Sequence, residues 1–171
     1  MAGSDHSTRF SASQGPRVVG PRDGKIVNLG GCSARFMVWA EESGGGFSLV
    51  EHPIPPGHLA APVHRHSRED EYSYVIEGRL GAQLGDDLVY AEAGDLVFKP
   101  RDQWHTFWNA DDTDCRLLEI ISPGGFEHYF DELVAGFISP DEQQERYGTE
   151  TDLERTRQLC DDLGLVFPPP P

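Results

Sequence analysis

Two histidines and a glutamate stand close together in the sequence at a spacing that suits metal binding. His64 and His66 are two residues apart, so both imidazoles project from the same side of an extended strand. Glu71 follows five residues after His66, which leaves room for a turn that returns its carboxylate toward the same side. Because neutral imidazole and carboxylate together suit first-row transition metals, the segment predicts part of a metal site.

A third histidine, His105, is the candidate fourth ligand. It begins a strand that follows a proline-led turn. If His105 faces inward on that strand, Phe107 faces inward as well, whereas Trp108 faces outward. A lone buried histidine is usually a core residue with satisfied hydrogen bonds, but three histidines and a glutamate at spacings compatible with one barrel favour a metal ion.

The elements that must position these residues are short strands. Between residues 25 and 121, apolar runs alternate with turns rich in glycine, proline and aspartate, at intervals of roughly 8–12 residues that are typical of an all-β sandwich or barrel. The runs are 36–39, 47–50, 72–76, 88–90, 96–98, 106–108 and 116–121. We therefore expect a β-barrel domain over residues 25–124.

After Pro123 the pattern becomes helical. Apolar residues follow the spacing of an amphipathic helix from Phe126 to Phe137. Ser139-Pro140-Asp141-Glu142 reads as a capping box with proline at the first helical position, and Thr151 with Glu154 repeats the capping signal before Gly164 ends the last helix. Residues 125–167 are therefore expected to form two or three helices that cover an outer face of the barrel.

The two ends of the sequence predict little regular structure. Residues 1–24 are rich in Ser, Gly, Pro and Arg without periodicity, and we expect a flexible arm in which residues 17–19 could form a short strand. Residues 168–171 are four prolines, which predict an extended polyproline tail.

The two candidate ligand segments resemble the two motifs of the cupin family. The first motif is met by His64, His66, Glu71 and Gly78, and the second by Gly94, Pro100, His105 and Asn109. Gly57 lies one residue further upstream than the pattern places its first glycine. Asp102 stands where the pattern has a second glycine, and aspartate tolerates a left-handed backbone better than most residues. The residues after the barrel look like the tail of single-domain bacterial cupins similar to quercetin dioxygenase.

The resemblance implies a small cupin barrel (a double-stranded β-helix or jelly roll) that holds one divalent metal ion with His64, His66, Glu71 and His105. Four protein ligands on an octahedral ion leave two positions for water, dioxygen or a substrate oxygen pair, which favours Fe, Mn, Ni, Co or Cu over tetrahedral Zn. The quercetinase resemblance also implies that Glu71 could leave the ion and act as a catalytic base.

The leading hypothesis is a dioxygenase-like oxidoreductase acting on a small aromatic or oxygenated compound. Two alternatives stay open, because fold and ligand set do not decide among them. One is a metal-dependent isomerase, cyclase or lyase that consumes no dioxygen. The other is a module that binds a small ligand without catalysis.

The composition limits the kinds of partner and the compartment that we expect for this protein. The net charge of −15, without a basic cluster, disfavours nucleic acid and anionic membranes. Three scattered cysteines argue against a disulfide framework, and the first thirty residues contain no secretory signal, so we expect a cytoplasmic protein.

Several other side chains have predicted positions. Tyr72, Tyr74 and Ile76 point away from Glu71 and are expected either under the C-terminal helices or in a dimer interface, since small cupins are usually homodimers. His52 and His58 match no ligand position and are expected at the surface or at the rim of a pocket. Candidates for the pocket lining, most of them more simply core, are Phe36, Val38, Val75, Phe98 and Phe107.

Overall fold

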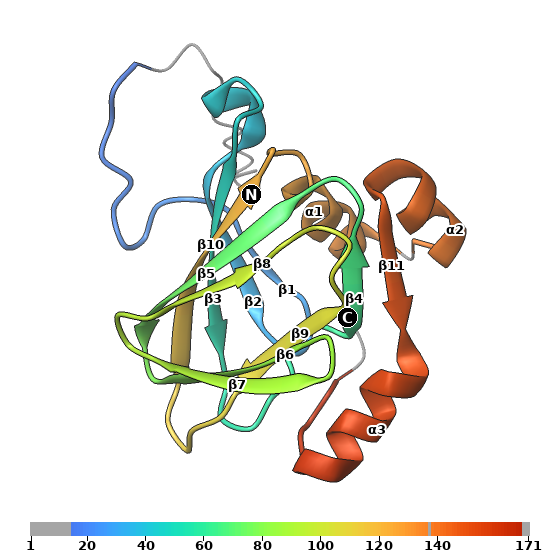
Figure 1. Ribbon diagram of the computed structural model, residues 1–171. Coiled ribbons are helices and arrows are strands. Elements are labelled where there is room, and N and C mark those ends of the chain that lie inside the picture. Colours follow the sequence, from blue (N-terminus) through green and yellow to red (C-terminus); the bar gives the residue numbers. More distant parts are fainter. Residues whose placement is uncertain (1–14, 137, 169–171) are drawn as a thin grey trace, which may run out of the picture.

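The computed structural model describes residues 15–136 and 138–168, and these form a barrel of two antiparallel sheets with a C-terminal extension against one side (Figure 1). The strand order is β1-β2-β3-β10-β5-β8 in the first sheet and β11-β4-β9-β6-β7 in the second. The strands are β1 (Ile26–Asn28), β2 (Ser33–Val38), β3 (Ser48–Ile54), β4 (Val63–His66), β5 (Asp70–Glu77), β6 (Arg79–Leu84), β7 (Asp87–Glu92), β8 (Leu96–Lys99), β9 (His105–Asn109), β10 (Cys115–Ser122) and β11 (Thr149–Asp152). The expected all-β architecture is confirmed.

Alternation along the strands separates the inside of the barrel from the outside. On β10, buried and half-buried residues alternate strictly from Cys115 to Ser122. β10 lies between β3 and β5, so its buried side chains face the centre of the barrel. Apolar residues fill most of this interior, but Glu71 and Glu119 are also buried there.

The C-terminal extension combines helices with a strand. After α1 (Glu127–Ala135) come α2 (Pro140–Glu142), the π-helical turn η2 (Gln143–Tyr147), β11 and α3 (Leu153–Leu163). The helices confirm the expectation for this region, and the strand was missed. β11 pairs antiparallel with β4, with Thr149 opposite His66, so the extension becomes part of the barrel wall.

The helix-capping signals are largely confirmed. Ser139 Oγ accepts a hydrogen bond from the backbone N–H of Glu142, whose side chain accepts from the N–H of Ser139. α3 ends at Gly164, which has φ 66°. Its N-cap is Asp152 rather than Thr151, because the Asp152 carboxylate accepts from the N–H of Arg155.

Outside these elements the expectations are confirmed in part. Residues 17–19 are irregular, and the first strand is β1. Tyr74 points outward as expected, but it is 41% exposed, so the C-terminal helices do not cover it. Trp108 also points away from the barrel interior, yet it is buried in a cluster with Leu59 and Leu159 of α3. The expected arm falls mostly on residues 1–14 and the proline tail mostly on 169–171, which lie outside the described residues.

None of the described helices is long and apolar enough to cross a membrane.

Candidate metal centre

The four residues singled out in the sequence converge inside the barrel. His64 and His66 come from β4, Glu71 from β5 and His105 from β9, and His64 pairs directly with His105 across β4 and β9. All four side chains are buried, and one possible ligand atom from each lies within 4.8 Å of the others. They form one buried three-histidine, one-glutamate cluster that is consistent with a metal ion.

Hydrogen bonds fix the orientation of the three imidazoles. The Nδ1 of His64 lies 2.7 Å from the carbonyl oxygen of Pro62, and the Nδ1 of His105 lies 2.9 Å from that of Gln103. A carbonyl oxygen can only accept, so each Nδ1 carries the proton and each Nε2 of the neutral ring offers a lone pair. His66 Nδ1 lies 3.2 Å from Thr149 Oγ1, a contact supplied by β11.

Glu71 sits between two of these rings. Its Oε1 is 3.2 Å from His66 Nε2, and its Oε2 is 3.2 Å from His105 Nε2. The Nε2 of His66 is fully buried and makes no hydrogen bond to any residue that the structure describes. Nitrogen lone pairs that face carboxylate oxygens without a shared proton would be satisfied by a cation, so the donor set fits a metal ion.

Burial and neighbouring charges set the protonation states that metal binding requires. Burial, followed by the neighbouring His105 and His66, lowers the pKa of His64 well below its ordinary value of 6.5. Burial also lowers the pKa of His105. Burial alone would raise the pKa of Glu71, but the buried ammonium of Lys99 holds it well below its ordinary value of 4.5. Neutral imidazoles beside an ionised carboxylate need release no proton to bind a metal.

A buried lysine continues the polar cluster beyond Glu71, and the sequence reasoning missed it. Lys99 Nζ lies 2.9 Å from Glu71 Oε2 and 3.0 Å from Glu119 Oε2, and it packs 4.5 Å from the centre of the Phe107 ring. Burial raises the pKa of Glu119 to about 7 against the opposing effect of Lys99. A signal was present, because Lys99 directly follows the apolar residues 96–98 and Glu119 interrupts the apolar residues 117–121.

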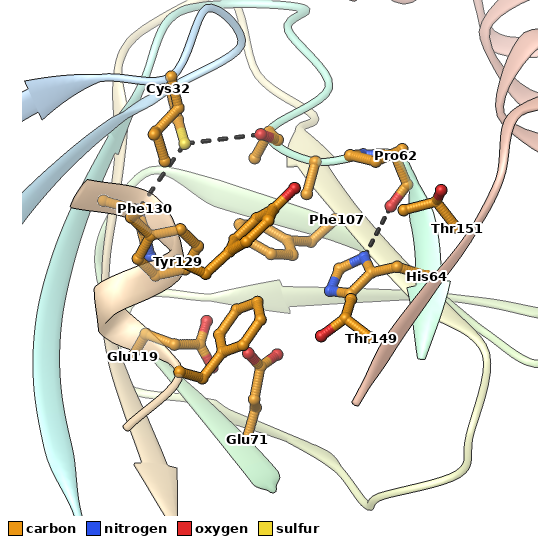
Figure 2. Close-up of a pocket in the computed structure, with 15 residues that line it drawn as sticks. Cys32, Pro62, His64, Glu71, Phe107, Glu119, Tyr129, Phe130, Thr149 and Thr151 are labelled. Atoms are coloured by element: carbon orange, nitrogen blue, oxygen red, sulfur yellow. Dashed lines mark hydrogen bonds between the residues drawn. The ribbon is translucent and has the colours of Figure 1, made fainter. Parts of the chain in front are cut away.

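A cavity opens directly beside the cluster (Figure 2). The two sheets contribute His64, Glu71, Phe107 and Glu119 to its lining, and α1 with the loop before it closes the other side with Phe126, Tyr129 and Phe130. The lining is largely apolar, and the cavity volume of about 60 Å³ would hold a few water molecules. The barrel therefore presents the polar cluster to a small, mostly apolar space.

The predicted pocket residues are only partly right. Phe107 lines the cavity, whereas Phe36 and Val75 are core residues and Phe98 is 47% exposed on the outside of the barrel. His52 is not at the surface: it is a buried residue of the cavity wall. Its inward position on β3 depends on strand register, which its sequence neighbourhood does not reveal.

The fold and the site together describe a small antiparallel β-barrel protein. Its interior holds a buried cluster of three histidines and one glutamate that is consistent with a metal ion. Residues 50–121 match the family model for the cupin domain. The match runs from β3 to β10 and includes all four residues of the cluster. Asp102, which replaces a motif glycine, has φ 64°, so the left-handed turn before His105 is retained as expected.

Two curated proteins are similar to parts of the chain. Quercetin 2,3-dioxygenase from Aspergillus japonicus is 33% identical over 102 residues, which are 56% of this chain and 29% of that protein. The tetracenomycin polyketide synthase protein TcmJ from Streptomyces glaucescens is 29% identical over 94 residues, which are 54% of this chain and 62% of that protein. The chain thus matches less than two thirds of the length of either.

Solved structures share the fold. KdgF from Halomonas sp. matches with a TM-score of 0.57 at 18% identity, covering 66% of this chain and 98% of that one. A predicted oxalate decarboxylase from Thermotoga maritima matches with a TM-score of 0.59 at 20% identity, covering 63% of this chain and 99% of that one. At these identities the likeness shows the cupin barrel alone.

Proposed function

We propose that this chain is a metal-dependent cupin enzyme of the dioxygenase type, acting on a small aromatic or oxygenated compound. The observation that carries the proposal is the buried three-histidine, one-glutamate cluster at the edge of a largely apolar cavity. One divalent transition-metal ion (Fe, Mn, Ni, Co, Cu or Zn) is the cofactor that such a donor set fits, with His64, His66, Glu71 and His105 as its ligands.

A metal ion held here would act as a Lewis acid toward a pair of substrate oxygens and would give electrons a route to dioxygen. The protein's own residues supply the rest. Lys99 donates a hydrogen bond to Oε2 of Glu71, so Oε1 is the oxygen better placed to accept a proton from a substrate hydroxyl, and Glu71 is the proposed base. Phe107, Phe126 and Phe130 line the space where this transfer occurs and shield it from bulk water.

The similarity to a quercetin 2,3-dioxygenase supports the dioxygenase assignment. The cavity volume of about 60 Å³ favours a small substrate over a polycyclic one. Similarity to the polyketide synthase protein TcmJ from Streptomyces glaucescens favours a second candidate. In it, the same centre serves a cyclase, isomerase or lyase that consumes no dioxygen.

We further propose a small-molecule substrate, no nucleic-acid or membrane partner, and a cytoplasmic location. The net charge of −15 supports the absence of polyanionic partners. All three cysteines are free thiols, as expected in a reducing compartment.

Metal content and oxygen consumption test the proposal together. Protein purified without chelator should contain about one transition metal per chain by elemental analysis, because four convergent ligands bind one ion tightly. His64→Ala and His105→Ala should each lose most of that metal, while His58→Ala, outside the cluster, should retain it. If both ligand variants bind metal as well as the parent does, the site assignment is wrong.

The loaded protein is then offered catechols, hydroxypyranones and flavonols in an oxygen electrode. Oxygen uptake with product formation supports the dioxygenase. Product without oxygen uptake supports the second candidate instead. Tight binding of these compounds with no product from any of them indicates a ligand-binding module.

A further inference from the structure

A second carboxylate, that of Glu119, faces the cavity beside the metal cluster (Figure 2). It comes from the centre of β10, on the sheet opposite the histidines of β4 and β9. The side chain is 1% exposed, so the protein has removed a carboxylate almost completely from bulk water. Such burial is costly unless each oxygen finds a partner.

Only one of the two oxygens of Glu119 has such a partner among the described residues. Oε2 accepts from Ser73 Oγ at 2.8 Å and from Lys99 Nζ at 3.0 Å. Oε1 is fully buried and has no hydrogen-bond partner in the part of the chain that the structure describes. Glu119 therefore lines the cavity and has one carboxylate oxygen, Oε1, without a hydrogen bond to the described residues.

Glu119 lies within reach of a ligand held at the metal cluster. Lys99 Nζ bridges Oε2 of Glu71, at 2.9 Å, and Oε2 of Glu119, at 3.0 Å, so these two carboxylate oxygens are no further apart than the sum of the two distances. A single aromatic ring spans a comparable length. The surrounding wall is formed largely by rings such as Phe107 and Phe126, which offer no acceptor of this kind.

The positive charge of Lys99 does not by itself explain why a second carboxylate, that of Glu119, is buried beside it. Lys99 already pairs with Glu71, and that contact gives the ammonium one counter-charge in the interior. Adding Glu119 places a further ionisable group in a low-dielectric site, and its desolvation works against stability. A group retained at that cost, with one oxygen unused, is better explained by a ligand.

We propose that Glu119 is a specificity-determining residue that accepts a hydrogen bond, at Oε1, from a hydroxyl or N–H group of the metal-bound ligand. The inference rests on the proposed function and narrows its substrate class. The preferred ligand is a single ring with one oxygen pair for the metal and a further hydrogen-bond donor on the same ring. Rings with a methyl group in that position leave Oε1 buried and unpaired, which weakens their binding.

Two pairs of matched probes test the proposal in the Co²⁺-loaded protein without oxygen. Pyrogallol is compared with 3-methylcatechol, and 1,2,4-benzenetriol with 4-methylcatechol, so that each pair differs by one hydroxyl in place of one methyl. Affinity is read from the change in the Co²⁺ absorption spectrum at pH about 8.5, above the ordinary range for a carboxyl group. In the parent, the hydroxyl member of at least one pair should bind about ten-fold more tightly or better, as expected for a hydrogen bond to a charged group.

Glu119→Gln is the informative variant, because glutamine keeps the shape and can still accept from Ser73 and Lys99 while turning a donor toward the cavity. We expect the preference for the hydroxyl member to fall to within about two-fold of unity, with cobalt content unchanged. Thr151→Val is the matched control, since it removes another polar group that lines the same cavity. It should leave the preference as in the parent.

The outcomes separate the two proposals. A loaded parent that binds both members of both pairs equally overturns the role of Glu119 alone, and this result does not require any variant to fold. A preference that survives in Glu119→Gln overturns it as well. A parent that takes up no metal overturns the proposed function, and the inference falls with it.

Discussion

Among individual residues, the buried histidine that is not a candidate ligand has the clearest electrostatic consequence. His52 lies in the cavity wall with Nδ1 3.0 Å from the carbonyl oxygen of Ser33. Burial lowers its pKa from 6.5 to about 4, and the positive charge of Lys99 acts in the same direction, while the Ser33 contact, Glu71 and Glu51 oppose it. The folded protein therefore keeps His52 neutral where an unfolded chain would protonate it.

This shift predicts how the stability of the metal-free protein depends on pH. Because the folded-state pKa is the lower one, the contribution of His52 is fully present above pH 6.5, is lost as pH falls toward 4, and changes little below that. Its size is on the order of 3 kcal/mol in the free energy of unfolding. Denaturant titrations of the parent and of His52→Gln are compared in the presence of chelator. As pH falls from 6.5 to 4, the free energy of unfolding should decrease more in the parent than in the variant. If the free energy of unfolding depends on pH in the same way in both proteins, the lowered pKa of His52 is wrong.

The ligand residues could be found in the sequence because their signal is local. The two-residue spacing of His64 and His66 orients both rings without knowledge of the rest of the fold. The pairing of Lys99 with Glu71 is different, since it depends on the register between β5 and β8, which places the two residues opposite each other. Glu119 is brought opposite Ser73 by a second register, between β10 and β5. Contacts between side chains of neighbouring strands depend on the register of the assembled sheet, so the sequence alone does not predict them.

At the scale of elements, the C-terminal extension contributes to the candidate metal centre. β11 places Thr149 against His66, and α1 with the residue before it brings Phe126 to the same ring, at 4.3 Å between ring centres. The helical signals of this region were readable because amphipathic spacing and capping residues are local. The four-residue strand β11 was not, since its sequence, TETD, has no apolar alternation and its ladder is provided by β4.

The entry into β11 should therefore affect metal binding. Gly148 has φ 65°, and a Cβ at this position would lie 2.4 Å from Ser67 Oγ and 3.0 Å from Arg68 Nε. Gly57 is a matched control because it has φ 67° and open space around the same position. Both alanine variants should lose about 1 kcal/mol from the left-handed backbone, and Gly148→Ala should lose more through the clash.

Metal affinity distinguishes the two variants further. Gly148→Ala displaces Thr149 from His66 and should weaken metal binding by roughly ten-fold, as is typical when a hydrogen-bond partner of a ligand is disturbed. Gly57→Ala should bind metal like the parent, as measured by competition with a chromophoric chelator. Equal affinity in both variants would show that β11 does not orient His66.

At the scale of the whole molecule, an apolar face remains uncovered on the outside of the six-stranded sheet. Tyr74, Leu96 and Phe98 are 41%, 53% and 47% exposed, and the rings of Tyr72 and Phe98 stack with centres 4.9 Å apart. β8 forms the last strand of this sheet, so within the described residues its outer edge has no partner. An aromatic patch beside an open strand edge is a surface that a protein normally pairs or protects.

We propose that a second copy of the chain covers this face, so that the protein is a homodimer. Two copies that each carry a charge of −15 repel one another, so the contact must come from the apolar patch, and the dimer should become stronger as salt screens the repulsion. In sedimentation equilibrium, the parent should behave as a dimer at micromolar concentration and Phe98→Lys as a monomer. Ile26→Lys is the control, because Ile26 is 60% exposed on β1, at the opposite edge of the same sheet. If the parent stays monomeric at high salt, a second copy of the chain does not cover the aromatic patch. If Ile26→Lys dissociates the dimer, the interface lies at the β1 edge instead.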